Sequence, residues 1–146
     1  MIVFSKQGPS IASEQITSLE KALGARLSDA YANFLMINNG GMPEPDVIDV
    51  VGMHGSPTDV QVFFGIGRDI QSSDLFWNLS VITERCPNQR MLPIACDSGG
   101  NPFCLKVKRG IASEVAYCDL DDPNCKIYYV AKNFDEFLAK LRRFEQ

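Results

Sequence analysis

Apolar residues three or four positions apart predict two helices near the start of the chain. Their apolar positions are Ile16, Leu19 and Leu23 in the first helix, and Tyr31, Phe34 and Leu35 in the second. The first helix is expected over residues 13–23 with Ser13 as its cap. The second is expected to begin at Ser28 or Asp29 and to end at the Asn39-Gly40-Gly41 turn.

Alternating residues and short apolar runs predict strands in the rest of the chain, after a proline-spaced loop at residues 42–46. The expected strands are 47–51, 60–64, 92–95, 103–108, 115–118 and 127–130. Two further helices are expected, a central one that Asp69 or Ser72 opens and a C-terminal one that Asn133 opens. Their apolar positions are Leu75, Leu79 and Ile82 in the central helix, and Phe134, Phe137, Leu138 and Leu141 in the last. This order predicts one α+β domain over residues 1–146. It would hold a mostly antiparallel curved sheet, N-terminal helices, one central helix and a C-terminal helix.

Two double-glycine turns interrupt these elements. The first, Asn39-Gly40-Gly41, ends a helix, and the second, Asp97-Ser98-Gly99-Gly100-Asn101, joins two strands. Glycine and asparagine adopt positive φ at low cost, and an aspartate side chain can bond the backbone of a turn. We interpret both turns as structural joints, formed by Asn39, Gly40, Gly41, Asp97, Gly99, Gly100 and Asn101.

The composition is that of a folded, acidic domain. Hydrophobic residues make up 45% of the chain and charged residues 22%, which excludes a disordered chain. The net charge of -4 and the isoelectric point near 4.9 argue against non-specific binding to nucleic acid or anionic membranes. The first six residues lack the apolar core of a signal peptide, and no run approaches membrane-spanning length. We therefore expect a cytoplasmic protein.

The five cysteines are odd in number, and none forms the C-x-x-C spacing of a zinc or thioredoxin-like site. They are Cys86, Cys96, Cys104, Cys118 and Cys125. We expect five free thiols, no metal and no cofactor, which also fits a reducing compartment.

The remaining motifs give little support for catalysis. His54 is the only histidine and lies in a Gly/Pro-rich loop. A hydrolase built on it stays an alternative, because catalytic triads are assembled in space. The segment Gly65-Ile66-Gly67 begins like a dinucleotide fingerprint, but Ile70 replaces the third glycine. The acidic residues 119–124 do not match a calcium-binding EF-hand, because Val130 stands where its last glutamate should be.

Acidic residues are segregated along the sequence. Between Arg26 and Arg68 there is no Lys or Arg, and the acidic residues there give a formal charge of -5; residues 114–125 give -4. Because the whole chain carries only -4, the remainder is net basic. The two stretches are either solvated loops or an acidic face that attracts a basic protein partner.

Trp77 is the only tryptophan, and a helical wheel turns it away from the stripe of Leu75 and Leu79. It either covers a second face of the core or serves as an exposed anchor for a partner. The partner-binding hypothesis therefore names one aromatic and seven acidic residues. They are Glu44, Asp46, Asp49, Asp59, Trp77, Asp119, Asp121 and Asp122.

An ordered set of motifs runs through residues 11–142. The motifs are Ile16-x-x-Leu19-Glu20-x-x-Leu23-Gly24, Leu27-Ser-Asp-x-Tyr31-x-x-Phe34-Leu35-x-x-Asn38-Asn39-Gly40-Gly41, Phe64-Gly65-Ile66-Gly67, Leu92-Pro93-Ile94-Ala95-x-Asp97-x-Gly99-Gly100-Asn101-x-x-Cys104-Leu105 and Tyr129-Val130-Ala131-x-x-Phe134-x-x-Phe137-Leu138. This set resembles the SUKH superfamily, which includes a yeast regulator of cell-wall synthesis and many bacterial immunity proteins. No single motif is specific, whereas their order is. Ser28 departs from the pattern, since the family often has proline there, but serine can also cap a helix.

The resemblance implies a compact α+β domain without an established catalytic site. Bacterial members are often encoded beside polymorphic toxins, many of them nucleases or deaminases, and neutralise them by tight binding. We therefore expect a non-enzymatic immunity protein that occludes the active site of a cognate toxin. A scaffold or regulatory protein that binds a resident cellular partner is the alternative. Binding surfaces in such a family vary with the toxin, so no binding residue transfers from it.

Overall fold

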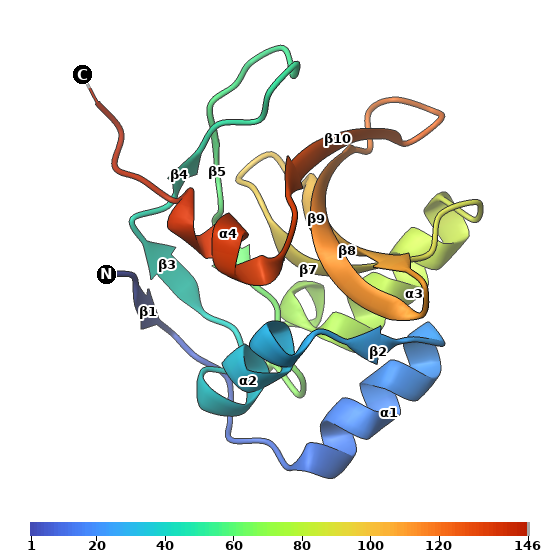
Figure 1. Cartoon of the computed structure of the whole chain (residues 1–146). Helices are drawn as coiled ribbons and strands as arrows, with labels where there is room; N and C mark the ends of the chain where they lie inside the picture. Colours follow the sequence, from blue (N-terminus) through green and yellow to red (C-terminus); the bar gives the residue numbers. More distant parts are fainter. Residues whose placement is uncertain (146) are drawn as a thin grey trace.

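The computed structural model describes residues 1–145, in which helices and short strands alternate (Figure 1). The helices are α1 (Ser13–Leu23), α2 (Asp29–Ile37), the 3-10 turn η1 (Gln71–Ser73), α3 (Leu75–Arg85) and α4 (Phe134–Ala139). The first six strands are β1 (Val3–Ser5), β2 (Arg26–Leu27), β3 (Met42–Glu44), β4 (Val47–Ile48), β5 (Thr58–Asp59) and β6 (Val62–Phe63). The last four are β7 (Met91–Cys96), β8 (Pro102–Lys108), β9 (Ile111–Asp119) and β10 (Lys126–Ala131).

A curved sheet forms the centre of the molecule (Figure 1). Its strands follow the order β10-β9-β8-β7-β6 and are antiparallel, while the short β2 pairs with β9 in parallel. Two separate antiparallel pairs, β1–β3 and β4–β5, complete the strand pairing. The α+β class and the mostly antiparallel sheet expected from the sequence are therefore confirmed.

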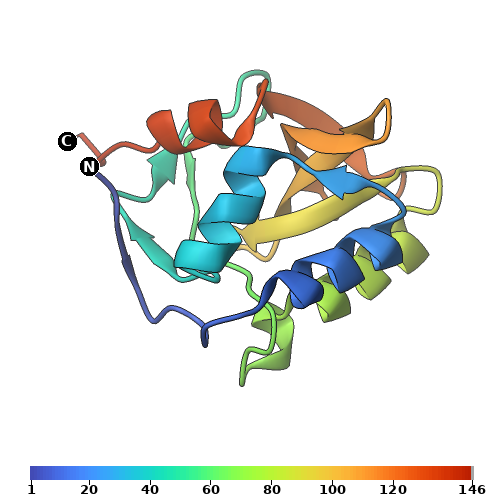
Figure 2. The same cartoon turned by 60° about the horizontal axis from the view of Figure 1, so that its bottom comes forward.

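The helices cover the sheet and close the core. In Figure 2, α1 and α3 run side by side, and α3 packs along β7 while α4 packs against β9 and β10. The predicted apolar stripes of α1, α2 and α3 are buried. Aromatic rings join the elements at the centre: the Phe34 ring lies 5.3 Å from that of Phe63 and 5.0 Å from that of Phe134. None of the helices described in residues 1–145 is long and apolar enough to cross a membrane.

Three local expectations are wrong. Asp74, rather than Asp69 or Ser72, caps α3, and its carboxylate accepts the backbone N–H of Trp77 at 3.2 Å. Ala12 rather than Ser13 occupies the cap position of α1. Part of the expected loop at residues 42–46 is strand β3, because the N-terminal strand β1 pairs with it.

The expectation of five free thiols is also wrong. Cys86 and Cys125 form a disulfide, whereas Cys96, Cys104 and Cys118 are free. The bridged residues are 39 positions apart, and only the packing of α3 beside the β9–β10 loop brings them together. The bridge removes the argument for a reducing compartment that rested on free thiols.

Candidate protein-binding site

A groove of about 560 Å³ lies between β6, the beginning of α3 and the β7–β8 turn. Trp77 lines it from α3, Phe64 from the position just after β6, and Ser98 from the turn. Trp77 is 36% exposed, so its ring is only partly packed and part of it is open to a partner. The charged residues that line the groove are Lys6, Arg68 and the buried Asp97, so the exposed charge of its wall is basic.

The first double-glycine turn holds the strand that forms one wall of this groove. The Asn39 side chain is buried; its Nδ2 donates to the carbonyl oxygens of Pro9 at 2.7 Å and Ile66 at 2.9 Å. Its Oδ1 accepts the N–H of Ile66 at 2.8 Å. Gly41, with φ of 128°, exchanges two backbone hydrogen bonds with Phe63 of β6. Asn39 and Gly41 thus join the N-terminal segment, the end of α2 and β6.

The second double-glycine turn contains a buried carboxylate. Asp97 is 4% exposed, and its Oδ1 accepts the backbone N–H of Asn101 at 2.9 Å. Its Oδ2 accepts the hydroxyl protons of Thr58 at 2.9 Å and Tyr117 at 2.6 Å. Burial, and then the hydrogen bond to Asp97, raise the pKa of Tyr117 well above its usual range. Gly100 alone supplies the positive φ here, because Gly99 does not adopt it.

Side-chain hydrogen bonds connect this turn to both acidic stretches of the sequence. The Asp59 carboxylate accepts the backbone N–H of Ser98 at 2.8 Å and also the Ser98 hydroxyl. On the other side of the turn, Asn101 Oδ1 accepts the N–H of Leu120 at 3.0 Å. The β5 strand and the β9–β10 loop are therefore bound to one turn. We call the carboxylates of these two segments, Asp59 next to the turn and Asp119, Asp121 and Asp122 in or beside the β9–β10 loop, the acidic rim.

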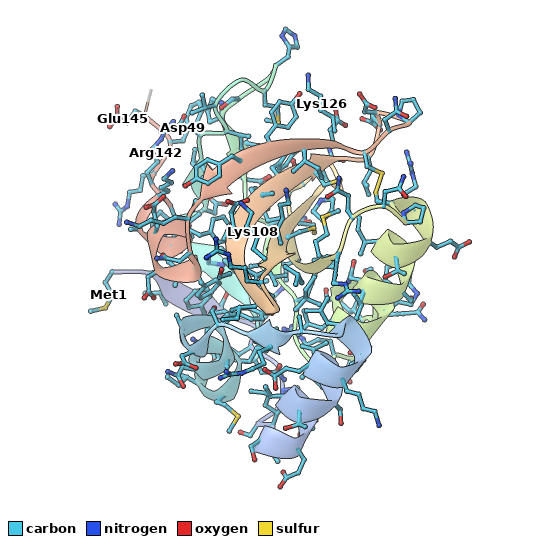
Figure 3. The ribbon with its side chains drawn as sticks, turned by 45° about the vertical axis from the view of Figure 1, so that its right-hand side comes forward. Met1, Asp49, Lys108, Lys126, Arg142 and Glu145 are labelled. Carbon is cyan, nitrogen blue, oxygen red and sulfur yellow. A yellow bond between two sulfur atoms is a disulfide. The ribbon has the colours of Figure 1, made fainter. Side chains whose placement is uncertain are left out.

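The other three acidic candidates are placed differently. Asp46 lies close to Asp59, because Val47 pairs with Asp59 and the Asp46 carbonyl accepts the N–H of Val60 at 2.7 Å. Glu44 is exposed on β3, where it pairs with Val3 of β1. Asp49 lies beside Arg142 (Figure 3), whose Nε and Nη2 donate to its two carboxylate oxygens at 2.8 and 2.9 Å.

The Asp49–Arg142 pair reduces what Asp49 adds to an acidic surface. The hydrogen bond from Arg142 lowers the pKa of Asp49, so the carboxylate stays charged, but the guanidinium charge next to it cancels much of its field. The structure therefore places Asp46 beside Asp59, connects Asp59 and the β9–β10 loop to one turn, and gives Asp49 a partner of its own. Sequence spacing could not reveal this pair, whose members are 93 residues apart.

The sequence profile of the SMI1 / KNR4 family (SUKH-1) matches residues 10–140. The chain belongs to this family. The SUKH resemblance drawn from the ordered motifs is thereby confirmed, and membership supports a non-enzymatic, protein-binding module of immunity or regulatory type. Comparison with curated proteins gives no match.

In this SUKH-1 chain, His54 lies in the loop between β4 and β5 and is exposed. Within residues 1–145, no side-chain hydrogen bond or ion pair joins its imidazole to a serine, cysteine or carboxylate. General base catalysis requires the base within hydrogen-bond reach of its nucleophile or its proton donor. The geometry around His54 gives no support to the hydrolase alternative.

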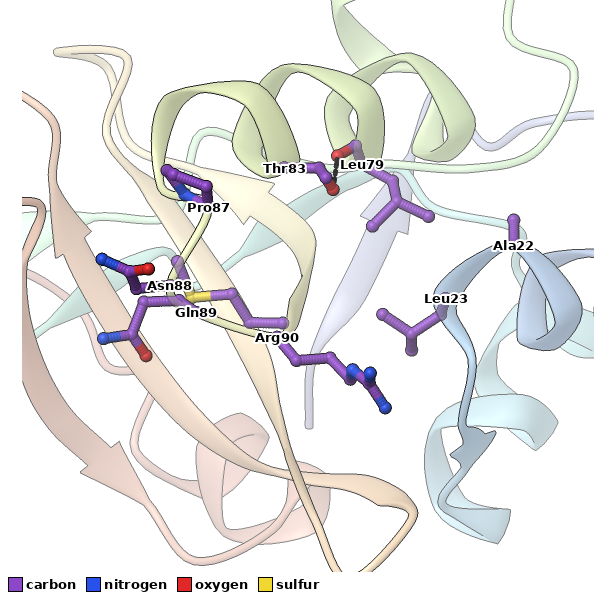
Figure 4. Close-up of a pocket in the computed structure, with 9 residues that line it drawn as sticks. Ala22, Leu23, Leu79, Thr83, Pro87, Asn88, Gln89 and Arg90 are labelled. Atoms are coloured by element: carbon purple, nitrogen blue, oxygen red, sulfur yellow. Dashed lines mark hydrogen bonds between the residues drawn. The ribbon is translucent and has the colours of Figure 1, made fainter.

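A second hollow, of about 350 Å³, lies between α1 and the end of α3 (Figure 4). Leu23 and Leu79 form its apolar side, and the Arg90 side chain extends into it. The Thr83 hydroxyl at its edge donates to the Leu79 carbonyl at 2.7 Å. Its lining contains no acidic residue and no histidine, so it provides neither an acid–base pair nor an acidic contact surface. The groove beside Trp77 is the better candidate for binding.

Several residues of the site carried no signal in the sequence. Tyr117 and Thr58 complete the shell of Asp97, and Ser98 links it to Asp59. Polar residues in strands and turns are common, so nothing in the local pattern distinguishes these three. Only the strand order, which places β5, β7 and β9 around one turn, shows their role.

Proposed function

We propose that this SUKH-1 protein is an immunity protein that binds a cognate toxin and covers its active site without performing chemistry itself. The observation that carries the proposal is the β7–β8 turn, to which Asp59 and the β9–β10 loop are both hydrogen-bonded. Two stretches that are acidic in the sequence thereby flank one structural joint. The same turn lines the groove that holds Trp77.

The acidic rim would recognise a basic surface. Toxins that act on nucleic acid need lysine and arginine residues to hold phosphate, and carboxylates on a partner compete for the same groups. Long-range attraction between such surfaces raises the association rate and weakens with added salt. The two proteins must meet inside the producing cell, and we therefore propose that this chain acts in the cytoplasm.

Trp77 would supply a packed anchor beside the charged rim. Tryptophan is among the residues that contribute most at protein interfaces when a partner fully desolvates it. Its partial exposure leaves ring surface for such a contact, and Ile70 and Val62 add apolar wall to the same groove. Charge would then guide the approach of the toxin, and the indole would hold it.

The test begins with capture of the native partner by the tagged full chain and identification by mass spectrometry. The purified partner is then assayed for its own activity with increasing amounts of this protein. We expect complete inhibition at one equivalent, and competition with the partner's substrate, because the proposal is occlusion. A partner whose activity is unchanged or increased would contradict occlusion and favour the scaffold or regulatory alternative.

Replacement of Trp77 by alanine tests the groove. We expect Trp77→Ala to weaken inhibition by about thirtyfold, the loss of roughly 2 kcal/mol that marks an interface hot spot. The matched control is Ile37→Ala, which removes another exposed apolar side chain from a helix, at α2. The control should change inhibition by less than about threefold, and equal losses in both variants would contradict the role of the groove.

A further inference from the structure

Three cysteine sulfurs meet at the root of the acidic β9–β10 loop. Cys86 is the C-cap residue of α3, Cys118 is near the end of β9, and Cys125 immediately precedes β10. Their Sγ atoms all lie within 4.8 Å of one another, and all three residues are buried. Two of these sulfurs form the disulfide, and the third is a free thiol beside it.

The Arg85 side chain accompanies this cluster. Arg85 Nη1 lies 3.5 Å from Cys125 Sγ, and Nη2 donates to the carbonyl oxygen of Leu120 at 2.6 Å. Burial and then the nearby Asp119 carboxylate raise the pKa of the Cys118 thiol to about 11, whereas Arg85 acts in the opposite direction. Buried sulfur of this kind stays a neutral thiol unless a cation compensates the thiolate charge.

The spacing of the three sulfurs fits one metal ion. A tetrahedral Zn²⁺ binds thiolate at about 2.3 Å, which places neighbouring sulfurs about 3.8 Å apart. The sulfurs reach this separation with small side-chain movements once the bridge is open, since none is farther than 4.8 Å from the others. Three thiolates and a divalent ion carry a net charge of -1, and the Arg85 guanidinium beside Cys125 offsets part of the negative charge that they and Asp119 place there. If Cys118 only filled space in the core, its position next to two other sulfurs and a cation would have no function.

We propose that Cys86, Cys118 and Cys125, when their bridge is reduced, bind one divalent thiophilic metal ion of the zinc class. Within residues 1–145 no fourth Cys, His, Asp or Glu joins the group, so water completes the coordination. The same three sulfurs thus close the root of the loop in two ways, by a disulfide under oxidising conditions and by a metal ion under reducing ones. The site is independent of the proposed toxin binding.

A small thiol serves as the reductant that converts the disulfide state into the metal-binding state. Two small thiols give two electrons and two protons to the Cys86–Cys125 bond and leave as their own disulfide. The three cysteine thiols then release three protons to solvent as the ion binds. The small disulfide is the oxidant for the reverse change: it takes two electrons from Cys86 and Cys125 and two protons from solvent to become two thiols, the S–S bond forms again, and the ion leaves as Cys118 is reprotonated.

The experiment uses the full chain reduced with a phosphine, which does not itself compete as a thiol ligand. Titration with Cd²⁺ should produce a thiolate-to-metal charge-transfer band that saturates at one equivalent. Competition between Zn²⁺-loaded protein and a chromophoric chelator then gives the zinc affinity. The oxidised chain should bind neither ion, because only one of the three sulfurs is then a thiol.

Cys118→Ser is the decisive variant, because it keeps the Cys86–Cys125 bridge, so its oxidised form shows by circular dichroism that it folds. After reduction its zinc affinity should fall by more than about a hundredfold, since loss of a second-shell partner alone costs ten- to a hundredfold. The matched control is Cys96→Ser, a free cysteine outside the cluster, which should bind within about threefold of the parent. Equal affinity in Cys118→Ser and the parent, or equal binding by the oxidised parent, would overturn the proposal.

Discussion

At the scale of single residues, Tyr31 stands out because its hydroxyl is buried without a partner. The side chain is fully buried in α2, and within residues 1–145 no hydrogen bond reaches its Oη atom. A buried polar group without a partner lowers stability, because it gives up its hydrogen bonds to water. We expect Tyr31→Phe to raise the free energy of unfolding at pH 7 by about 1 kcal/mol in urea denaturation. Loss of stability instead would show that the hydroxyl has a partner.

The burial of Tyr31 also predicts a loss of stability at alkaline pH. Burial raises the pKa of Tyr31 far above its usual range, whereas the unfolded chain titrates near a pKa of about 10. Below pH 10 both states hold the proton, so its effect on stability is constant. Above pH 10 the unfolded state releases a proton that the folded state keeps, so the free energy of unfolding falls as pH rises.

Each proton that the folded state keeps and the unfolded state releases lowers the free energy of unfolding by about 1.4 kcal/mol per pH unit. Tyr31→Phe should therefore lose stability less steeply than the parent between about pH 10 and 11. Urea denaturation at a series of pH values measures both slopes. Tyr129→Phe is the control for the loss of one tyrosine hydroxyl, because Tyr129 is 55% exposed on β10, and the slope of Tyr31→Phe should be the shallower of the two. Parallel curves for Tyr31→Phe and the parent would contradict the prediction.

At the scale of elements, the beginning of α3 depends on Asp74. Its carboxylate accepts the N–H groups of Gly67 at 3.0 Å and Trp77 at 3.2 Å, so it connects the strand-to-helix turn with the first helical turn. Removal of a helix cap costs about 1 kcal/mol or somewhat more. We expect Asp74→Ala to lower the free energy of unfolding by about 1–2 kcal/mol in urea denaturation. Asp69→Ala, at one of the two exposed positions that the sequence indicated as the cap, should change it by less than about 0.5 kcal/mol.

The helices could be predicted from the sequence because their stripes are local. Leu75, Leu79 and Ile82 show the period of α3 without knowledge of any partner, and all three are buried. The cap could not be chosen as reliably, since Asp69, Ser72 and Asp74 are all acceptable cap residues and tertiary position decides among them. Strands of two or three residues, such as β1 and β5, are too short to show a period. They form because a distant segment pairs with them.

At the scale of the whole molecule, the sequence showed acidic stretches but not how they meet. The absence of Lys and Arg between Arg26 and Arg68 is visible in the printed chain. Asp59 and the β9–β10 loop are connected through the β7–β8 turn, to which each is hydrogen-bonded. Arg142, near the other end of the chain, pairs with Asp49. A charge count along the sequence contains neither fact, because both depend on contacts between segments far apart.

This arrangement makes a specific prediction for association kinetics. Asp121 is exposed in the acidic rim, and within residues 1–145 its carboxylate accepts no hydrogen bond, so its charge can be reversed without loss of a structural contact. Asp121→Lys should slow association with the captured partner by about three- to tenfold at low ionic strength, because it weakens long-range attraction. Stopped-flow or surface-based kinetics over a series of salt concentrations measures this rate.

The control must change the total charge equally at another place. Glu14→Lys does so on α1, which lies far from the β9–β10 loop in Figure 1, and Glu14 is also exposed. If net charge alone guided association, both variants would slow it equally. If the acidic rim guides association, only Asp121→Lys should slow it. The difference between the two association rates should then shrink at high salt, because the Debye length falls to about 3 Å at 1 M. A difference that persists at high salt would point to a direct contact at Asp121, and no difference at any salt would remove the rim from the binding surface.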